Sequence, residues 1–409
     1  MSGRLRKIGV VLGVMGASGF WGCRGEGQSV ESDLVVSSDA ALGRVAASFL
    51  PDLVRRSGME LEAPVRIERR TREELAAYLT RKLDEEFPEE QAGLTRSAYA
   101  LFGLVSPDTD LRATLHSLYT EQVAGFYEPD SAALFLLDDQ PKEMVEGVLL
   151  HELVHAVQDQ TADLKALTDD SLGNDRKTAA HAAIEGHAML VMMEFVAERA
   201  QGREVDLGAI DDFAGTLRPA MEGMAGEFPA LSNAPEVLRA SLLFPYLEGT
   251  SYVQRLWHAT EERTNPFEDR LPLSTEQVMT GDLTDVPVHL DVEVPRGGTV
   301  LESDGLGRLE VEVLLRTHAG ESAVVAGTGW GGDRYVLVES DGGRRSLVWY
   351  SVWDSERDRE EFVEALAPHL ASFPAGARME RVDVDGLSGV RLEVGDPPPS
   401  AARRVMGSR

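Results

Sequence analysis

Two histidines and a glutamate in the middle of the chain have the spacing of a metal site. His151 and His155 are four residues apart in the run His-Glu-Leu-Val-His, and Glu152 directly follows the first histidine. On a helix, residues four apart rise from one face with Cβ atoms about 5–6 Å apart, so two neutral imidazoles can reach a single zinc ion. Glu152 would project about 100° round the helix, beside the ion, where its carboxylate can accept a proton from a water. The pattern therefore predicts a zinc site with an adjacent general base.

The segment that carries these residues is predicted to be a buried helix. Pro141 provides a start, no residue up to Gln160 breaks a helix, and apolar residues fall on nearly every side. The alternative is a buried helix in which the histidines bond to carbonyls and Glu152 forms a salt bridge. Burying three polar groups is costly unless each is satisfied, and a metal satisfies two of them together. This favours the zinc interpretation.

A second buried helix is predicted downstream over 178–195, a stretch rich in alanine and methionine. Its small residues, Ala182 and Gly186, would let it approach the first helix closely. A catalytic zinc needs a third protein ligand and an open fourth position. Two acceptable ligand types lie on this segment, the carboxylate of Glu185 and the imidazoles of His181 and His187.

Together these segments resemble the gluzincin branch of the zinc metallopeptidases. In that branch the third ligand is a glutamate on a second helix, so the resemblance implies that His151, His155 and Glu185 bind Zn²⁺. Family members often have an aspartate four residues after the ligand glutamate, which orients a zinc histidine. Met189 occupies that position here, so Asp159, one turn after His155, is the candidate substitute.

The chain also resembles a group of bacterial secreted and lipoprotein H-E-x-x-H proteins. The resemblance is carried by the segments HELVHAVQDQ and AAIEGHAML and by residues 243–257 and 273–279. Gluzincins usually supply a tyrosine or histidine that stabilises the oxyanion opposite the general base. Tyr246 and Tyr252 are the candidates for this role, and Tyr127 is a further residue that can reach the site. For each of them the alternative is ordinary aromatic packing.

The resemblance implies a zinc-dependent metallopeptidase, a hydrolase acting on peptide or protein substrates. Glu152 would take a proton from the water on the metal, and would pass it to the leaving amine after attack on the scissile carbonyl. Another interpretation is a non-enzymatic surface lipoprotein with a structural zinc helix pair, which binds a partner through its C-terminal unit. A third is a metallohydrolase of another bond, such as an amide in cell-wall material. Water as the fourth ligand would favour an enzyme, because structural zinc sites usually have four protein ligands.

Composition and the N-terminus bound the other functions. The formal net charge of −29 over 409 residues argues against nucleic-acid binding, which requires a basic surface. Basic residues, an apolar run over 8–20 and then Cys23 predict a signal peptide over 1–22. Cys23, the only cysteine, resembles a lipobox cysteine, which implies a lipid anchor as the sole membrane attachment, with 23–39 as a tether. The expected location is the cell envelope, with secretion as the alternative.

The predicted fold class is α+β. A mostly helical zincin-like domain is expected over 40–285, a small α+β domain over 286–395 and a disordered tail over 396–409. The polar stretch 163–177 is expected to be a solvated connector between the two zinc helices.

A β-hairpin is predicted over 123–138, where two β-prone segments flank the turn Glu-Pro-Asp-Ser. In zincin folds an edge strand above the active-site helix binds extended peptide by strand addition, and this hairpin lies immediately before the predicted zinc helix.

Overall fold

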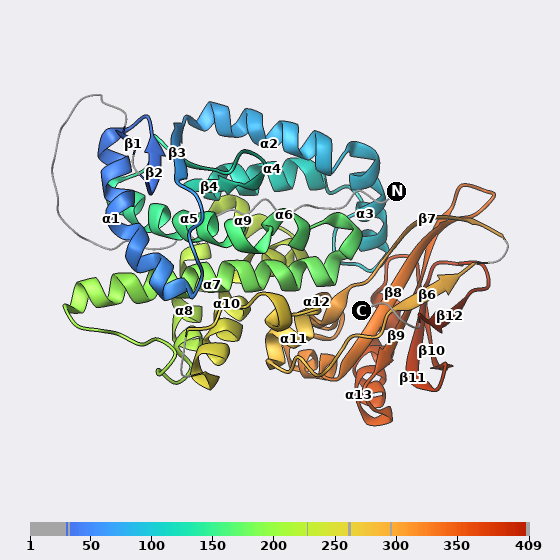
Figure 1. The fold of residues 1–409 in the computed structure, drawn as a ribbon. Coiled ribbons are helices and arrows are strands. Elements are labelled where there is room, and N and C mark those ends of the chain that lie inside the picture. The colour runs from blue at the N-terminus through green and yellow to red at the C-terminus, as the bar shows by residue number, and fades with distance from the viewer. Residues whose placement is uncertain (1–29, 32, 227, 261–262, 295–296, 406–409) are drawn as a thin grey trace.

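The computed structural model describes residues 30–405 apart from 32, 227, 261–262 and 295–296 (Figure 1). The expected signal peptide, Cys23 and the first part of the tether lie outside the described residues. Within the described part of the chain, no helix combines the length and apolar character needed to cross a bilayer. The fold is α+β as predicted, with a mostly helical portion followed by an antiparallel sheet and its helices.

The helical portion contains a small mixed sheet of order β1-β2-β3-β5-β4. Strands β2, β3 and β5 are parallel, while β4 pairs antiparallel with β5 as the predicted hairpin and forms one edge of the sheet. Strands β1 and β2 come from the stretch expected to be a tether. The strand bounds are β1 Val30–Glu31, β2 Val35–Ser37, β3 Val65–Arg70, β4 Gly125–Glu128 and β5 Ala133–Leu137.

The helices of this portion begin where the sequence supplies caps. Asp39 accepts the amides of Ala41 and Leu42 at the start of α1, and Thr71 and Glu74 form the capping box of α2. The helix bounds are α1 Ala40–Ser57, α2 Arg72–Glu86, α3 Glu89–Leu101, α4 Leu111–Gln122, α5 Lys142–Ala162, α6 Leu164–Leu167, α7 Asn174–Gln201, α8 Phe213–Ala225, α9 Pro229–Asn233, α10 Glu236–Ala259 and α11 Thr275–Thr280, with 3₁₀ turns η1 Pro129–Ser131, η2 Asp170–Leu172 and η3 Glu268–Arg270.

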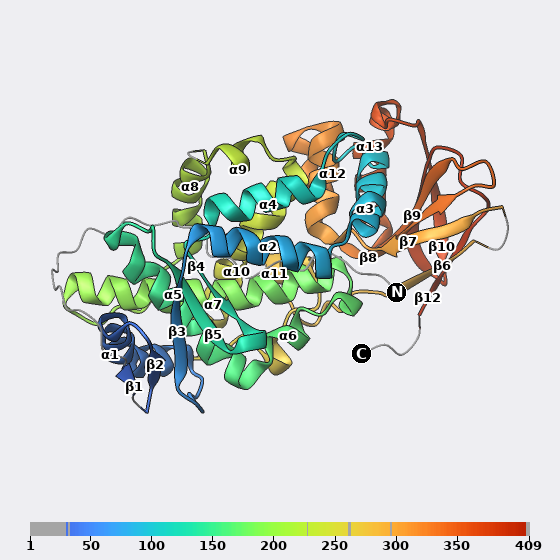
Figure 2. The ribbon, with the colours of Figure 1, turned by 90° about the horizontal axis from the view of Figure 1, so that it is seen from above.

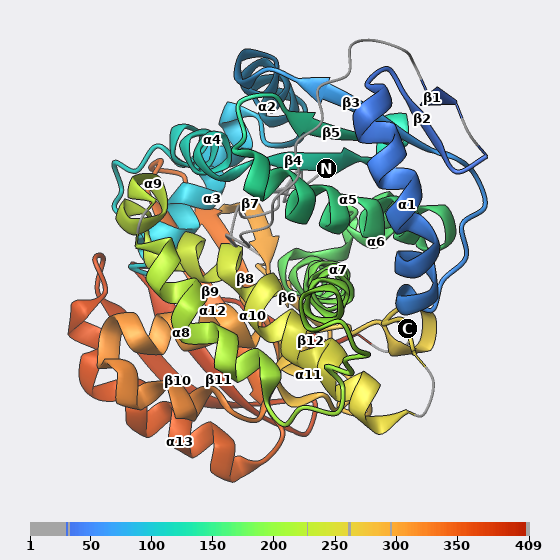
Figure 3. The ribbon, with the colours of Figure 1, turned by 90° about the vertical axis from the view of Figure 1, so that its left-hand side faces the viewer.

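Helix α7 lies at the centre of the helical portion, between α5 and α10 (Figure 3). A Cβ atom on Gly186 would lie 2.1 Å from the backbone of Gly249 in α10, and one on Gly249 would lie 2.1 Å from the carbonyl oxygen of Ala182. Ala182 and Gly186 therefore lie at the close contact of α7 with α10. The sequence predicts them at the contact with α5 instead.

The C-terminal portion is an antiparallel sheet of order β10-β11-β9-β8-β7 with helices α12 and α13 (Figure 2). Its bounds are β7 Thr299–Asp304, α12 Gly307–Ala319, η4 Glu321–Gly327, β8 Trp330–Glu339, β9 Arg345–Trp353, α13 Glu356–Leu366, η5 Ala367–Ser372, β10 Ala377–Val384 and β11 Leu387–Val394. Strand β6 (Leu290–Glu293) pairs with β12 (Ala401–Arg404). The prediction of a disordered tail is therefore wrong for Ala401–Arg404.

The hydrophobic core runs continuously from the helical portion into the C-terminal sheet. Phe102, at the end of α3, meets the rings of Tyr335 and Trp349 edge-on, with centroids 5.5 Å and 6.3 Å away. Such aromatic pairs bury large areas. The two portions therefore share one hydrophobic core.

A half-buried carboxyl group, Asp175, lies at the contact between these portions, near the start of α7. Its Oδ1 accepts hydrogen bonds from the backbone amide of Thr275 at 3.0 Å and from the Thr275 hydroxyl at 2.5 Å. Burial raises the pKa of Asp175 to about 7; the bonds from Thr275 oppose the rise, while Asp333 and Asp304 add to it. The expectation of a solvated connector over 163–177 is therefore wrong at this residue.

The close contact between α7 and α10 predicts a large cost for Gly186→Ala. The added methyl group would overlap the α10 backbone, so the free energy of unfolding should fall by about 3 kcal/mol or more. Urea titration measures this change. The control is Gly93→Ala in α3, where the new Cβ would meet nothing within 4 Å; it should be neutral or stabilising by about 0.5–1 kcal/mol. Equal stabilities of the two variants would contradict the packing described.

The raised pKa of Asp175 predicts a particular pH dependence of stability. Since the folded chain binds this proton more tightly than the unfolded chain, the contribution is present below the unfolded value of 3.8 and is lost as pH rises toward 7. We expect Asp175→Asn to remove about 2–4 kcal/mol of the loss seen between these two pH values in chemical unfolding. The exposed Asp108→Asn should leave the wild-type pH slope unchanged. A slope for Asp175→Asn equal to that of wild type would be the contrary result.

Candidate metal centre

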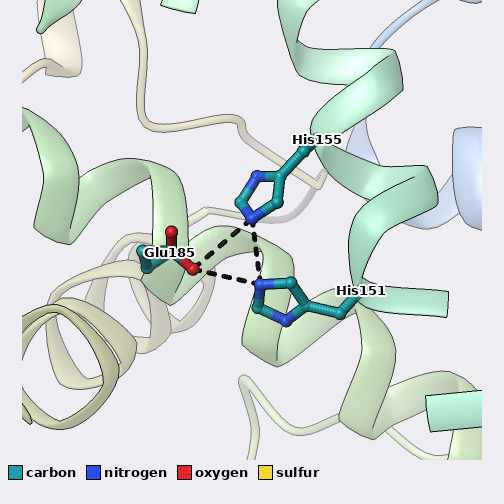
Figure 4. Close-up of side chains that lie close together, drawn as sticks. All are labelled: His151, His155 and Glu185. Atoms are coloured by element: carbon teal, nitrogen blue, oxygen red, sulfur yellow. Dashed lines mark hydrogen bonds and ion pairs between the residues drawn. The ribbon is translucent and has the colours of Figure 1, made fainter. Parts of the chain in front are cut away.

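Three candidate ligands from two helices converge at one point (Figure 4). His151 and His155 come from α5 and Glu185 from α7. His151 Nε2 lies 3.0 Å from both His155 Nε2 and Glu185 Oε2, and His155 Nε2 lies 3.4 Å from Glu185 Oε2. All three side chains are buried, and Glu185 has no exposed surface.

These separations fit a single zinc ion. Ligand atoms at zinc-bond lengths of about 2.0–2.1 Å in tetrahedral directions lie about 3.3 Å from one another. The three observed separations, 3.0, 3.0 and 3.4 Å, bracket this value closely. Two imidazole nitrogens and a carboxylate oxygen are also a donor set that suits zinc. The residues present therefore fit the metal that the sequence predicts.

The electrostatics of these three groups favour a positive charge between them. Burial alone would raise the pKa of Glu185, but the two imidazoles outweigh it and hold the pKa far below its usual range. For His155, burial acts in the opposite direction and lowers the pKa. The carboxylates of Glu185 and Glu152 outweigh burial and raise the pKa of His155 to about 9. For His151 burial prevails, and its pKa is lowered. An ionised carboxylate held in a dry interior requires a cation beside it, which zinc would supply.

Gln158 fixes the orientation of His155. The amide nitrogen of Gln158 donates to the backbone carbonyl of Ile184 at 3.0 Å, so its Oε1, 2.8 Å from His155 Nδ1, is the acceptor for that ring N–H. In the neutral form of His155, the form that binds a metal ion, the Nε2 lone pair then faces His151 and Glu185. This is the tautomer that a zinc ligand needs, set by a hydrogen bond to its other nitrogen.

Asp159 does not have the orienting role predicted for it. Its carboxylate accepts the Tyr127 hydroxyl at 2.9 Å and the backbone amide of Leu164 at 3.0 Å. The sequence reasoning missed Gln158, whose only signal was an amide three residues after His155 on the helix that carries both histidines.

The competing histidines of α7 stand outside the group of three. His187 has its Nε2 3.0 Å from the carbonyl oxygen of Ser57 and its Nδ1 3.0 Å from the Gln158 amide nitrogen. His181 Nε2 lies 3.5 Å from Oε1 of Glu185, the carboxylate oxygen turned away from His151. Among the described residues, the ligand atoms that gather here are those of His151, His155 and Glu185.

Glu152 lies beside this group without an exposed surface. Neither of its carboxylate oxygens bonds to a side chain of the described residues. The backbone amide of Tyr127 in β4 lies close enough to lower the pKa of this carboxyl group. Burial is the main reason that the pKa of Glu152 is raised to about 8. The nearby His155 lowers this pKa, and the carboxylate of Glu185 raises it. A buried carboxyl group without a side-chain partner is costly, and such groups concentrate at functional sites.

The candidate tyrosines lie in three different settings. The Tyr246 ring is buried in α10 with its centroid 6.4 Å from that of His151. The Tyr252 hydroxyl donates to the backbone carbonyl of Arg270, so the Tyr252 side chain connects α10 to the 3₁₀ turn η3. Tyr127, at the end of β4, donates to Asp159 and lines the pocket described next.

A pocket opens at the His155 and Glu185 side of the metal centre. Residues of α2, the end of β4 and α6 form its walls, including Tyr78, Lys82, Glu128 and Lys165. His155 and Glu185 are the two candidate ligands among the residues that line it.

A second carboxylate cluster, Glu276, Asp285 and Asp354, lies in the C-terminal half. The Arg308 guanidinium is 3.6 Å from Glu276 and already supplies positive charge there. We assign no metal to this cluster.

Comparison with known proteins places only the C-terminal part of the chain. Residues 297–403 match the model of a domain of unknown function (DUF8575). No curated protein and no solved structure matches the chain.

Loss of the Gln158 amide should weaken zinc binding. In Gln158→Leu, the imidazole of His155 is free to rotate and to change tautomer, so zinc affinity should fall about 10- to 100-fold. Competition with a chromophoric chelator measures this affinity. The control is Gln160→Leu, the same substitution at a residue that binds the backbone of Glu62 and Ala63 instead. Equal zinc affinities of the two variants would show that Gln158 does not position His155.

Proposed function

We propose that the protein is a zinc-dependent metallopeptidase. The observation that carries this proposal is the convergence of His151, His155 and Glu185, with the buried carboxylate of Glu152 beside them. When bound, zinc would supply Lewis acidity, which lowers the pKa of a water and polarises a carbonyl.

Glu152 is the proton-transfer group in this proposal. Its carboxylate accepts a proton from the attacking water and later releases it to the leaving amine nitrogen of the cleaved peptide bond. Because burial raises the pKa of Glu152, its carboxyl group can hold the proton between these two steps.

Strand β4 provides a means of holding an extended peptide. It is the edge strand of its sheet, it contacts α5, and it ends at the pocket beside the metal centre. A peptide backbone added to this edge would pair with main-chain groups irrespective of its sequence. Tyr246, whose ring lies next to His151, is the residue we propose for stabilising the oxyanion.

The number of protein ligands favours an enzyme over a structural zinc protein. Structural sites usually close all four positions with side chains, whereas three protein ligands are typical of catalytic zinc. Three ligand residues gather here among those described. A surface lipoprotein with structural zinc therefore receives less support, and a hydrolase of another amide bond is a matter for the substrate screen.

The test pairs metal analysis with hydrolysis of a peptide library and of peptidoglycan fragments. Glu152→Gln should keep one zinc per chain and lose hydrolysis by a factor of about 10²–10⁴, since only the proton acceptor changes. His151→Ala and Glu185→Ala should both lose zinc, measured by elemental analysis. Full activity of Glu152→Gln, or unchanged zinc content in both ligand variants, would reject the proposal; cleavage of peptidoglycan fragments alone would reassign the substrate.

A further inference from the structure

The pocket beside the metal centre contains an unequal set of charges. Three of its lining carboxylates, Glu86, Glu128 and Asp130, face only two lining lysines, Lys82 and Lys165. Both lysines form ion pairs with Glu86 or Asp130. Lys82 lies 3.0 Å from Asp130 and 3.4 Å from Glu86, and Lys165 also pairs with Asp130.

Glu128 is the carboxylate that these pairs leave over. It accepts hydrogen bonds from the Ser131 hydroxyl, at 2.6 Å, and from the Tyr78 hydroxyl, but no lysine or arginine nitrogen of the described residues lies within 4.0 Å of it. The Glu128 side chain is half-buried at the end of β4. It follows Tyr127 in the chain, and both residues line the pocket. Its charge is therefore directed into a partly dehydrated space, where an added cation would be attracted more strongly than in water.

The rest of the pocket suits the stem of a long basic side chain. The rings of Tyr78 and Tyr127 line it together with the apolar side chains of Leu164 and Ile184. Lysine and arginine pack their methylene groups along such surfaces while their charged ends remain at a polar group, and aromatic faces attract cations. The net charge of −29 adds a long-range attraction for cationic peptides.

We propose that this pocket binds a lysine or arginine side chain of the substrate, with Glu128 as the specificity-determining residue. The inference rests on the proposed peptidase function and adds the substrate class to it. The pairing is electrostatic: the guanidinium or ammonium group of the substrate side chain takes the place beside Glu128 that the lysines of the pocket do not fill.

The test uses peptides that differ at one position, carrying arginine, its neutral isostere citrulline, or glutamate, placed in turn at each residue flanking the scissile bond. For wild type, kcat/KM at one of these positions should be about tenfold higher for arginine than for citrulline. Glu128→Gln should bring this ratio close to one, and Glu128→Lys should favour glutamate instead. The control is Glu85→Gln, which removes the same charge from an exposed position on α2 outside the pocket and should keep the wild-type ratio.

A binding measurement separates this inference from the proposed function. Zinc-loaded Glu152→Gln should bind the arginine peptide about tenfold more tightly than the citrulline peptide, and the double variant with Glu128→Gln should bind both alike. Cleavage without a preference for arginine, or a preference that survives Glu128→Gln, would overturn the inference and leave the peptidase proposal standing. Failure of the zinc-loaded wild type to cleave or bind any of the peptides would overturn both.

Discussion

The burial of one negative charge constrains much of the molecule. Glu185 is ionised and has no exposed surface, so its carboxylate is stabilised only by groups that the fold brings to it. The nearest of these are His151 and His155, which belong to another helix. A displacement of α7 relative to α5 by a fraction of a turn would separate the three ligand atoms and leave the carboxylate buried without compensation. The position of α7 is therefore the quantity that the surrounding structure has to fix.

Contacts distributed along α7 fix that position. Near its middle, Gly186 lies against the backbone of α10, which leaves no room for sliding. His187 is bonded to α1 through the Ser57 carbonyl and to α5 through Gln158. Further along, Glu194 forms a buried ion pair with Arg56 of α1, with a nitrogen–oxygen distance of 3.2 Å. Because buried pairs are costly to break, these contacts hold α7 in one register against its neighbours.

The sequence predicts the parts of this arrangement that are encoded locally. The four-residue spacing of His151 and His155 follows from helix geometry alone, as do the capping box of α2 and the β4–β5 hairpin. Glu185 was reached through a family resemblance, since nothing in its own segment distinguishes it from a buried structural carboxylate. Gln158 could not be predicted, because its orienting role depends on the carbonyl of Ile184, which only the packing of α7 on α5 brings near. Asp175 was misassigned for the same kind of reason: a polar stretch indicates solvent unless a distant residue, here Thr275, covers it.

The C-terminal portion takes part in the same constraint. Asp175 is the second residue of α7, and the backbone that packs on it includes Gly307 at the start of α12, where a Cβ atom would lie 1.9 Å from the Asp175 carboxylate. The amides of Leu306 and Gly307 are in turn held by Asp333 of β8. This chain of contacts connects residues matched to the domain of unknown function with the helix that carries Glu185. Removing that domain would expose Phe102 and the other core residues packed on the sheet and would also release the start of α7. The C-terminal sheet is therefore part of the packing that positions the candidate metal ligands, since both the core and the contacts of α7 include it.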